Sequence, residues 1–299
     1  MNRLIGVVFV LAALAAAAPA SARPLPGAPS CPLFPKWPTS QRVDRLPVAP
    51  GSGAMVASIG SGDTVHPDFG SGLYEGRAIG IPFDVVSRRT RRSSVSFEYA
   101  DESDRVRYPI PPGVHIEGGG DRHALLVDRD ACRLFELYAL ERTGSSWRAG
   151  SGAVWRLTRK PRYRPAGWTS ADAAGLPILP LLARYDEVRR GRIDHALRVT
   201  VQRSRRAWVL PARHFASSLT DPALPRMGER LRLKASVDTS RLGRQARVIA
   251  RAMQEYGLIV ADNGSDWYVS GAPDPRWDND DLRTLRALSG ADFEVVSAR

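Results

Sequence analysis

The chain has 299 residues, enough for a large hydrophobic core in one or two domains. It carries 43 lysine and arginine residues against 31 aspartate and glutamate residues, a formal net charge of +12, and it has only two cysteines. Neither cysteine has a companion at metal-ligand spacing, which excludes a zinc finger.

The first predicted element is a secretory signal peptide at residues 1–22. Arg3 supplies a positive charge, residues 4–18 are apolar, and the small residues ASA at 20–22 are typical of a cleavage site. No later apolar stretch approaches the roughly 18 residues of a membrane span. We therefore expect cleavage near Ala22, a secreted or periplasmic mature chain, and no membrane insertion.

A stretch at 23–53 with eight prolines and little periodicity follows, and it predicts an extended N-terminal tail. It contains Cys31, and the other cysteine is Cys132. In an oxidising compartment the two would form a disulfide that pins the tail to the next domain, whereas the alternative is two buried free thiols. Closing a loop of about 100 residues is worth about 4–5 kcal/mol in the chain-entropy model.

Residues 54–299 predict a single β-rich globular domain. Short runs with β-like patterning are bounded by Gly, Pro, Asp or Ser, and short helices are expected at 169–174 and 184–190. The sum predicts a mainly β fold, a β-sandwich or jelly roll, with a few helices. The predicted strands are 78–86, 95–99, 124–128, 133–140, 153–157, 193–201 and 207–210.

Two stronger helical patterns lie near the C-terminus. Residues 242–256 place apolar side chains on one stripe that ends before Gly257, and Asp278 can cap a second helix that carries three leucines. Between the two helices, the runs 258–261 and 267–270 flank Asn263-Gly264, a sequence that predicts a hairpin.

The stretch VHIEGGGDRH at 114–123 concentrates candidate catalytic groups. If its three glycines form a hairpin loop, Glu117 faces Asp121 and His115 faces His123, all on one face of the sheet. A two-residue turn after Asp128 would then place Glu136 opposite His123 on the next strand. The same face would also carry the apolar residues Leu125, Val127 and Leu134, as expected of the wall of a cleft.

Two facing carboxylates repel, so the pKa of one is raised and it can act as a general acid while the other stays ionised. Glu117 and Asp121 therefore suit two-carboxylate glycoside chemistry, with His115, His123 and Glu136 beside them. No cofactor is predicted; the alternative is a divalent metal held by His115, His123 and Glu117. A solvated hairpin tip without chemistry is a further alternative, and a one-residue slip in register would split the group.

Further candidate ligand-binding residues lie in or beside predicted strands. Tryptophan rings stack on sugar faces but also fill sandwich cores, and loop-borne histidines and arginines bind ligands but also form structural hydrogen bonds. The candidates are Trp155, Trp168, Asp194, His195, Arg213 and His214.

The chain contains no Walker A, Gly-x-Ser-x-Gly, His-Glu-x-x-His or dinucleotide motif, so the corresponding enzyme classes have no support. The phrases GDRHALLVDRD, GWTSADAAGLPILP, RIDHALR and ADNGSDWY resemble an uncharacterised family of exported bacterial proteins. The resemblance covers most of the chain after the signal peptide and implies secretion but no particular activity. Relatives tend to carry an Asn-Trp-Asn phrase before an RVDRLPVA-like segment, and this chain has KWPTSQ there.

We therefore predict an exported protein that acts on or binds carbohydrate or another extracellular polymer, with glycan hydrolase or polysaccharide lyase as the enzyme class. The alternatives are a non-catalytic cell-envelope or binding protein and a metal-dependent enzyme. Arginine runs at 88–92, 156–164 and 203–206 predict solvated surface, or a patch for an anionic envelope polymer. Export argues against a nucleic-acid partner.

Overall fold

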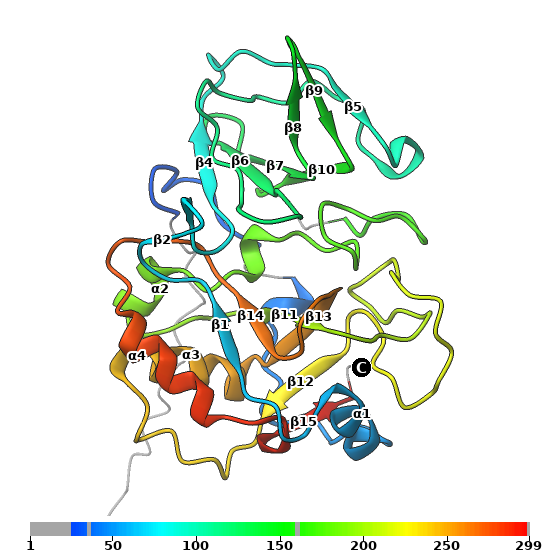
Figure 1. The fold of residues 1–299 in the computed structure, drawn as a ribbon, viewed down its shortest axis with the longest axis vertical. Helices are drawn as coiled ribbons and strands as arrows, with labels where there is room; N and C mark the ends of the chain where they lie inside the picture. Colours follow the sequence, from blue (N-terminus) through cyan, green and yellow to red (C-terminus); the bar gives the residue numbers. More distant parts are fainter. Residues whose placement is uncertain (1–24, 35–36, 159–161, 298–299) are drawn as a thin grey trace, which may run out of the picture.

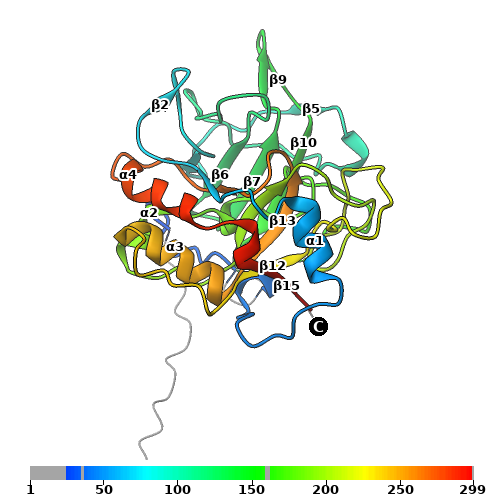
Figure 2. The ribbon, with the colours of Figure 1, turned by 60° about the horizontal axis from the view of Figure 1, so that its bottom comes forward.

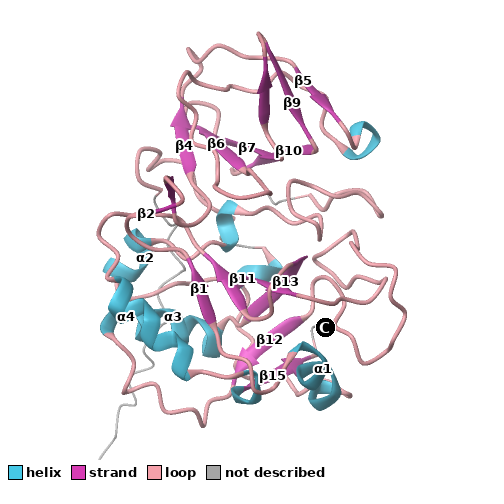
Figure 3. Ribbon diagram, viewed as in Figure 1, coloured by secondary structure: helices cyan, strands magenta, loops and turns pink. Residues whose placement is uncertain are grey.

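The computed structural model describes residues 25–34, 37–158 and 162–297 (Figure 1). The predicted signal peptide at 1–22 lies outside the described residues. Strands in several sheets dominate the described part, with few helices and long connecting loops (Figure 3). The predicted mainly β fold with a few helices is confirmed.

The largest sheet has six strands in the order β1-β14-β11-β13-β12-β15. It is mixed, because β1 runs parallel to β14 and β11 runs parallel to β13, whereas the other neighbours are antiparallel. The hairpin predicted around Asn263-Gly264 is wrong, because β11 lies between β13 and β14 and pairs with both. The strands are β1 (His66–Asp68), β11 (Leu197–Val201), β12 (Arg230–Leu233), β13 (Leu258–Asn263), β14 (Tyr268–Ser270) and β15 (Phe293–Val296).

A second sheet has four strands in the order β10-β7-β6-β4. Strands β6, β7 and β10 are antiparallel neighbours, and β4 pairs with β6 in parallel. The strand predicted at 124–128 has these bounds in the structure. The four strands are β4 (Phe83–Val86), β6 (Ala124–Asp128), β7 (Arg133–Tyr138) and β10 (Ser151–Arg156).

Two smaller sheets complete the β structure. The three-stranded sheet β5-β9-β8 brings Phe97 and Trp147 against one face of the four-stranded sheet. The predicted strand at 78–86 is split into β3 and β4, since Gly80 adopts a φ of 113° and Pro82 cannot donate a ladder hydrogen bond. The strands are β2 (Leu73–Tyr74), β3 (Arg77–Ala78), β5 (Val95–Phe97), β8 (Glu141–Thr143) and β9 (Ser146–Ala149).

Helices cover the six-stranded sheet on one side. Helix α3 (Arg244–Glu255) packs against β12, α1 (Ser52–Ile59) packs against β15, and α4 (Asn279–Arg283) lies beside α3 (Figures 1 and 2). The two helices predicted near the C-terminus are thus present. Asp278 caps α4 as predicted, because its carboxylate accepts hydrogen bonds from the backbone N–H groups of Asp280 and Asp281.

The other predicted short elements differ from the structure. Helix α2 (Tyr185–Arg189) matches the helix predicted at 184–190. Residues 169–174, however, are not helical, and residues 207–210 form only an isolated bridge between Trp208 and Met227. Short 3-10 helices lie at Pro38–Ser40, Ala100–Glu102, Leu179–Leu181, Thr284–Ala287 and Gly290–Asp292.

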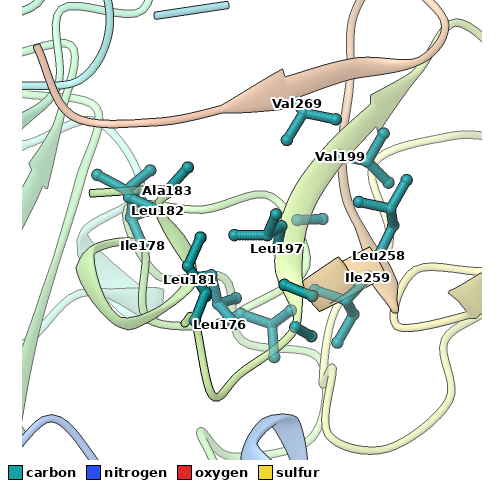
Figure 4. Close-up of a cluster of buried hydrophobic side chains, with 14 of the residues drawn as sticks. Leu176, Ile178, Leu181, Leu182, Ala183, Leu197, Val199, Leu258, Ile259 and Val269 are labelled. Carbon is teal, nitrogen blue, oxygen red and sulfur yellow. The ribbon is translucent and has the colours of Figure 1, made fainter. Parts of the chain in front are cut away.

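The buried side chains of the described residues form two clusters, one on each face of the four-stranded sheet. Alternation along β6 places Leu125 and Val127 in the larger cluster and Ala124 and Leu126 in the smaller one. The larger cluster continues through the segment 176–183 to β11, β13 and β14 (Figure 4). The two large sheets therefore share one core.

The N-terminal segment joins this core. Among residues predicted as an extended tail, Leu25, Phe34 and Trp37 are fully buried in the larger cluster. Cys31 and Cys132 form the predicted disulfide, which ties this segment to the turn between β6 and β7 across a sequence separation of 101 residues. The N-terminal segment is therefore part of the domain's hydrophobic core, and the disulfide also links it covalently to the β6–β7 turn.

Replacement of both cysteines, Cys31→Ser with Cys132→Ser, should lower the free energy of unfolding by about 4–5 kcal/mol, because the unfolded chain regains the freedom of a loop of about 100 residues. Urea denaturation of the oxidised wild type and of the variant measures this difference. Equal midpoints and equal slopes for the two proteins would contradict it.

Candidate functional site

A cavity of about 410 Å³ lies between the two large sheets. Its wall is built from the end of β7, the start of β10, the end of β13 and four connecting segments. Its size is within the range of small-ligand sites. The lining residues are Tyr99, Glu102, Asp121, Tyr138, Ser151, Thr169, Ser170, Ala171, Ala173, His214, Ala216, Asp262 and Asn263.

Three of the predicted catalytic residues converge at this cavity. One ligand atom each from Glu117, Asp121 and His123 lies within 4.8 Å of the other two. Asp121 is exposed and lines the cavity, Glu117 is partly buried, and His123 is fully buried. The glycine-rich loop therefore gathers two acids and an imidazole, as its sequence indicated.

Both nitrogens of His123 face acceptors. Nδ1 lies 2.5 Å from Oε2 of Glu117, and Nε2 lies 3.0 Å from the carbonyl oxygen of Ala171. Burial disfavours the charged imidazole, but the Glu117 carboxylate overcomes this and raises the pKa of His123 to about 8. The pKa of Glu117 is lowered: burial opposes its charge, but the charge and hydrogen bonds of His123 prevail. The two residues form an ion pair at neutral pH.

The predicted hairpin at 114–123 is not formed, and His115 does not face His123. Both edges of β6 are already paired, with β4 on one side and β7 on the other, so no ladder remains for residues 114–117. His115 is exposed, and its Nδ1 lies 2.7 Å from Oδ1 of Asp84 in β4. His115 is therefore excluded from the alternative metal-ligand set, and Asp121 takes its place.

Glu136 does not lie opposite His123. The turn between β6 and β7 has four residues instead of two, because Asp128 pairs with Arg133, and Glu136 therefore faces Leu125. Glu136 is fully buried, and its carboxylate accepts hydrogen bonds from the backbone N–H groups of Ile178 and Leu179 and from Trp155 Nε1, each at 2.9 Å. Burial raises its pKa to about 7, against the effect of these donors. Its contacts are those of a core carboxylate.

The remaining candidates divide between the cavity and other places. His214 lines the cavity, with Nδ1 2.7 Å from the carbonyl oxygen of Ala173 and Nε2 3.8 Å from Oε2 of Glu102. Arg213 turns its guanidinium onto the ring of Trp208 instead.

Neither predicted tryptophan lines the cavity. Trp155 is buried against Trp37 and bonded to Glu136, and the ring of Trp168 lies under the guanidinium of Arg164. The aromatic rings of the lining are Tyr99 and Tyr138. These two tyrosines, and not the predicted tryptophans, are positioned to stack on a ligand in the cavity.

Asp194 and His195 lie away from the cavity. Asp194 pairs with Arg192, and it lines a separate cavity of about 260 Å³ beside α3. His195 is fully buried, with Nε2 3.0 Å from Oε2 of Glu187 in α2 and Nδ1 2.7 Å from the carbonyl oxygen of Ala196. The first candidate is a surface ion pair and the second is part of the core.

A buried arginine behind the cavity holds together the part of the wall that comes from the six-stranded sheet. Arg198 in β11 donates from Nε to Asp172 Oδ1 at 2.8 Å, from Nη1 to Ser270 Oγ at 2.9 Å and from Nη2 to Asp262 Oδ2 at 2.6 Å. Burial, which Arg198 only partly offsets, raises the pKa of Asp262 to about 6, and it raises the pKa of Asp172 as well. Asp262 is thus a cavity-lining carboxyl that is partly protonated near neutral pH.

Sequence reasoning missed this arginine and its partners. Arg198 alternates with Leu197 and Val199 along β11, and a polar residue at such a position predicts a solvated face. Asp68, at the end of β1, is a further acid near this group: burial raises its pKa, and the negative charges of Glu117 and Asp121 add to this. Only the pairing of strands distant in sequence shows that these groups share one site.

Comparison of the chain with protein-family models, with curated proteins and with solved structures finds no match in any of the three. In the part of the chain that the structure describes, no helix is both long enough and apolar enough to cross a membrane. The function is therefore argued from the geometry and charge of the cavity.

The His123–Glu117 pair predicts a pH dependence of stability. The folded-state pKa of His123, about 8, lies above the ordinary value of about 6.5, so its stabilising contribution is complete below about pH 6.5 and is lost as the pH rises through 8. The loss is on the order of 2 kcal/mol. Urea denaturation between pH 6 and pH 9, as approximate limits, measures it.

His123→Gln should abolish this pH dependence, whereas the matched control His115→Gln should keep it, because His115 is exposed. If both variants and the wild type show the same slope of stability against pH, the ion pair does not have the stated effect.

Proposed function

We propose that the protein is exported and that the cavity between its two large sheets binds carbohydrate. The disulfide supports a location outside the reducing cytoplasm, and the sequence at 1–22 supports export. The resemblance to exported bacterial proteins is in keeping with the same location.

The lining of the cavity supports a carbohydrate ligand. It combines carboxylates and the rings of Tyr99 and Tyr138 with the hydroxyl oxygens of Ser151 and Thr169. Each of these two hydroxyl groups donates its hydrogen to a backbone carbonyl and keeps its oxygen as an acceptor, whereas Ser170 is fully buried and its hydroxyl both donates and accepts within the protein. Carboxylates and hydroxyls hydrogen-bond to sugar hydroxyl groups, and aromatic rings cover the apolar faces of sugars. This combination of groups is the observation that carries the proposal.

Within the class of glycan-degrading enzymes, the charges favour a hydrolase with Asp262 and Asp121 as the acid/base pair. Asp262 has a pKa of about 6 and can donate a proton to a leaving group, while Asp121 is exposed to the cavity as the partner carboxylate. Glu117, which the sequence indicated as one member of the pair, is held ionised by His123 and would position the loop.

A lyase is less favoured by the same lining. Elimination from a uronic acid requires that the substrate carboxylate be neutralised, and a lysine or arginine side chain does this directly. Among the described residues that line the cavity there is no lysine or arginine. The same absence argues against an anionic envelope polymer as the ligand of this cavity.

Asp262→Asn and Asp121→Asn should each reduce kcat on a hydrolysed glycan by about 10²–10⁴-fold, because each removes one proton-transfer group. Release of reducing ends from a panel of soluble glycans gives the rate, and Glu75→Gln, at an exposed acid that does not line the cavity, is the matched control. A non-catalytic binding protein would instead show no turnover in the wild type, with weaker binding in Asp121→Asn. If the wild type neither hydrolyses nor binds any glycan of the panel, the proposal is refuted.

The convergence of Glu117, Asp121 and His123 favours a metal-dependent enzyme as the second candidate. Nε2 of His123 is occupied by the carbonyl of Ala171, so a neutral imidazole would direct the lone pair of Nδ1 toward the two carboxylates. These three residues would hold a divalent ion, with water or substrate completing its ligands.

If this second candidate is correct, the purified protein should contain about one equivalent of metal, and Asp121→Asn should release it. Elemental analysis before and after treatment with a chelator measures the content. A metal content near zero in protein that remains fully active would remove the candidate.

A further inference from the structure

The charge of the cavity is opposite to that of the chain. The chain has a net charge of +12, yet the described lining contains Glu102, Asp121 and Asp262 and no lysine or arginine. Three other cavities in the described part of the chain each include arginine: Arg42, Arg192 and Arg251 in one, Arg184 and Arg276 in another, and Arg105 and Arg107 in the third. A negative cavity is therefore a local property of this site.

The carboxylates of the lining are not equally satisfied. Oε2 of Glu102 accepts from the backbone N–H of Thr169, and Asp262 accepts from Arg198 and from the backbone N–H of Asn263. Among the described residues, no side-chain or backbone group makes a hydrogen bond or ion pair with the carboxylate of Asp121. Asp121 is the acid that a ligand meets without displacing an existing partner.

The residues directly behind the lining leave the negative charge in excess. Glu117 is neutralised by His123, and the single guanidinium of Arg198 is shared between Asp172 and Asp262. Arg164, which is buried nearby, is paired with Asp104. The carboxylate of Asp121 therefore lacks a compensating cation among the described residues, and the two acids Asp172 and Asp262 have one guanidinium between them.

We propose that the sugar bound in this cavity carries a free ammonium group, so that the ligand class is an amino sugar polymer or oligomer that is not N-acetylated. The inference rests on the proposed carbohydrate function and deepens it. The ammonium pairs with Asp121, the sugar hydroxyl groups donate to the hydroxyl oxygens of Ser151 and Thr169, and the ring lies against Tyr138. Charge complementarity then selects among sugars of similar shape.

Three ligands of one length separate the possibilities. A glucosamine tetramer is cationic, its N-acetylated counterpart is neutral, and a galacturonic acid tetramer is anionic. The affinity of the full mature chain for each, measured by calorimetry at low and at moderate salt, should rank them in that order. We expect the cationic tetramer to bind at least about tenfold more tightly than the neutral one, with the difference shrinking as salt rises.

Asp121→Asn should reduce the preference for the cationic over the neutral tetramer to within about threefold, while binding of the neutral tetramer persists. Glu75→Gln, an exposed acid outside the lining, should leave the preference unchanged. Asp121 is exposed and without a partner among the described residues, so its replacement is compatible with folding, which thermal unfolding verifies.

The outcomes distinguish this inference from the proposed function. Equal affinity for the cationic and neutral tetramers, tighter binding of the anionic tetramer, or a preference that survives Asp121→Asn would overturn the inference and leave a carbohydrate site. No binding of any tetramer would overturn both. If Mn²⁺, Ca²⁺ or Zn²⁺ alone binds in a manner that depends on Asp121 and the cationic tetramer does not bind, the inference is overturned. The negative charge of the cavity would then serve a metal ion and not an amino sugar.

Discussion

The buried ion pairs of Arg198 are the interaction on which the rest of the site depends. Its guanidinium is almost fully buried, and it joins a loop acid, Asp172, to Asp262 in β13 and to Ser270 in β14. Taking a charge out of water is costly, and only close partners and complete hydrogen bonding offset the cost. One side chain thereby fixes three segments that are far apart in the sequence.

The same constraint determines the chemistry available to the cavity. Two acids share one guanidinium in a buried place, so both carboxyl pKa values are raised, and Asp262 is the one that lines the cavity. On the opposite wall, His123 holds Glu117 ionised and leaves Asp121 without an ion-pair partner among the described residues. A carboxyl group with a raised pKa and a carboxyl group without an ion-pair partner among the described residues thus face one space, although the chain as a whole is strongly basic.

Part of this arrangement was predictable from the sequence because it is local. Alternation predicted that Leu125, Val127 and Leu134 share one face, and all three lie in the larger core cluster even though the turn between β6 and β7 is longer than expected. A shift of two residues preserves the face but changes the partner, which is why Glu136 meets Leu125 and not His123. The disulfide was predictable because the chain has only two cysteines and an expected oxidising compartment. The Asp278 cap was predictable because it depends only on adjacent residues.

The rest was not predictable because it depends on pairing between distant segments. Strand β4 occupies the edge of β6 that the predicted hairpin needed, and β11 enters between β13 and β14. The sequence around residues 114–123 and 258–270 contains no local pattern that predicts pairing with β4 or with β11. Arg198 illustrates the point: its position in β11 suggests a solvated side chain, and only the assembled sheet buries it.

A double-mutant cycle on Arg198 and Asp172 tests the central interaction most directly, with the free energy of unfolding as the readout. Arg198→Met alone leaves two buried acids without their cation and should cost about 3–5 kcal/mol. Adding Asp172→Asn to it should cost less than the same change in the wild type, by at least about 1 kcal/mol. If the two changes add within about 0.5 kcal/mol, the guanidinium does not hold the acids in place, and the account of the cavity built on it is wrong.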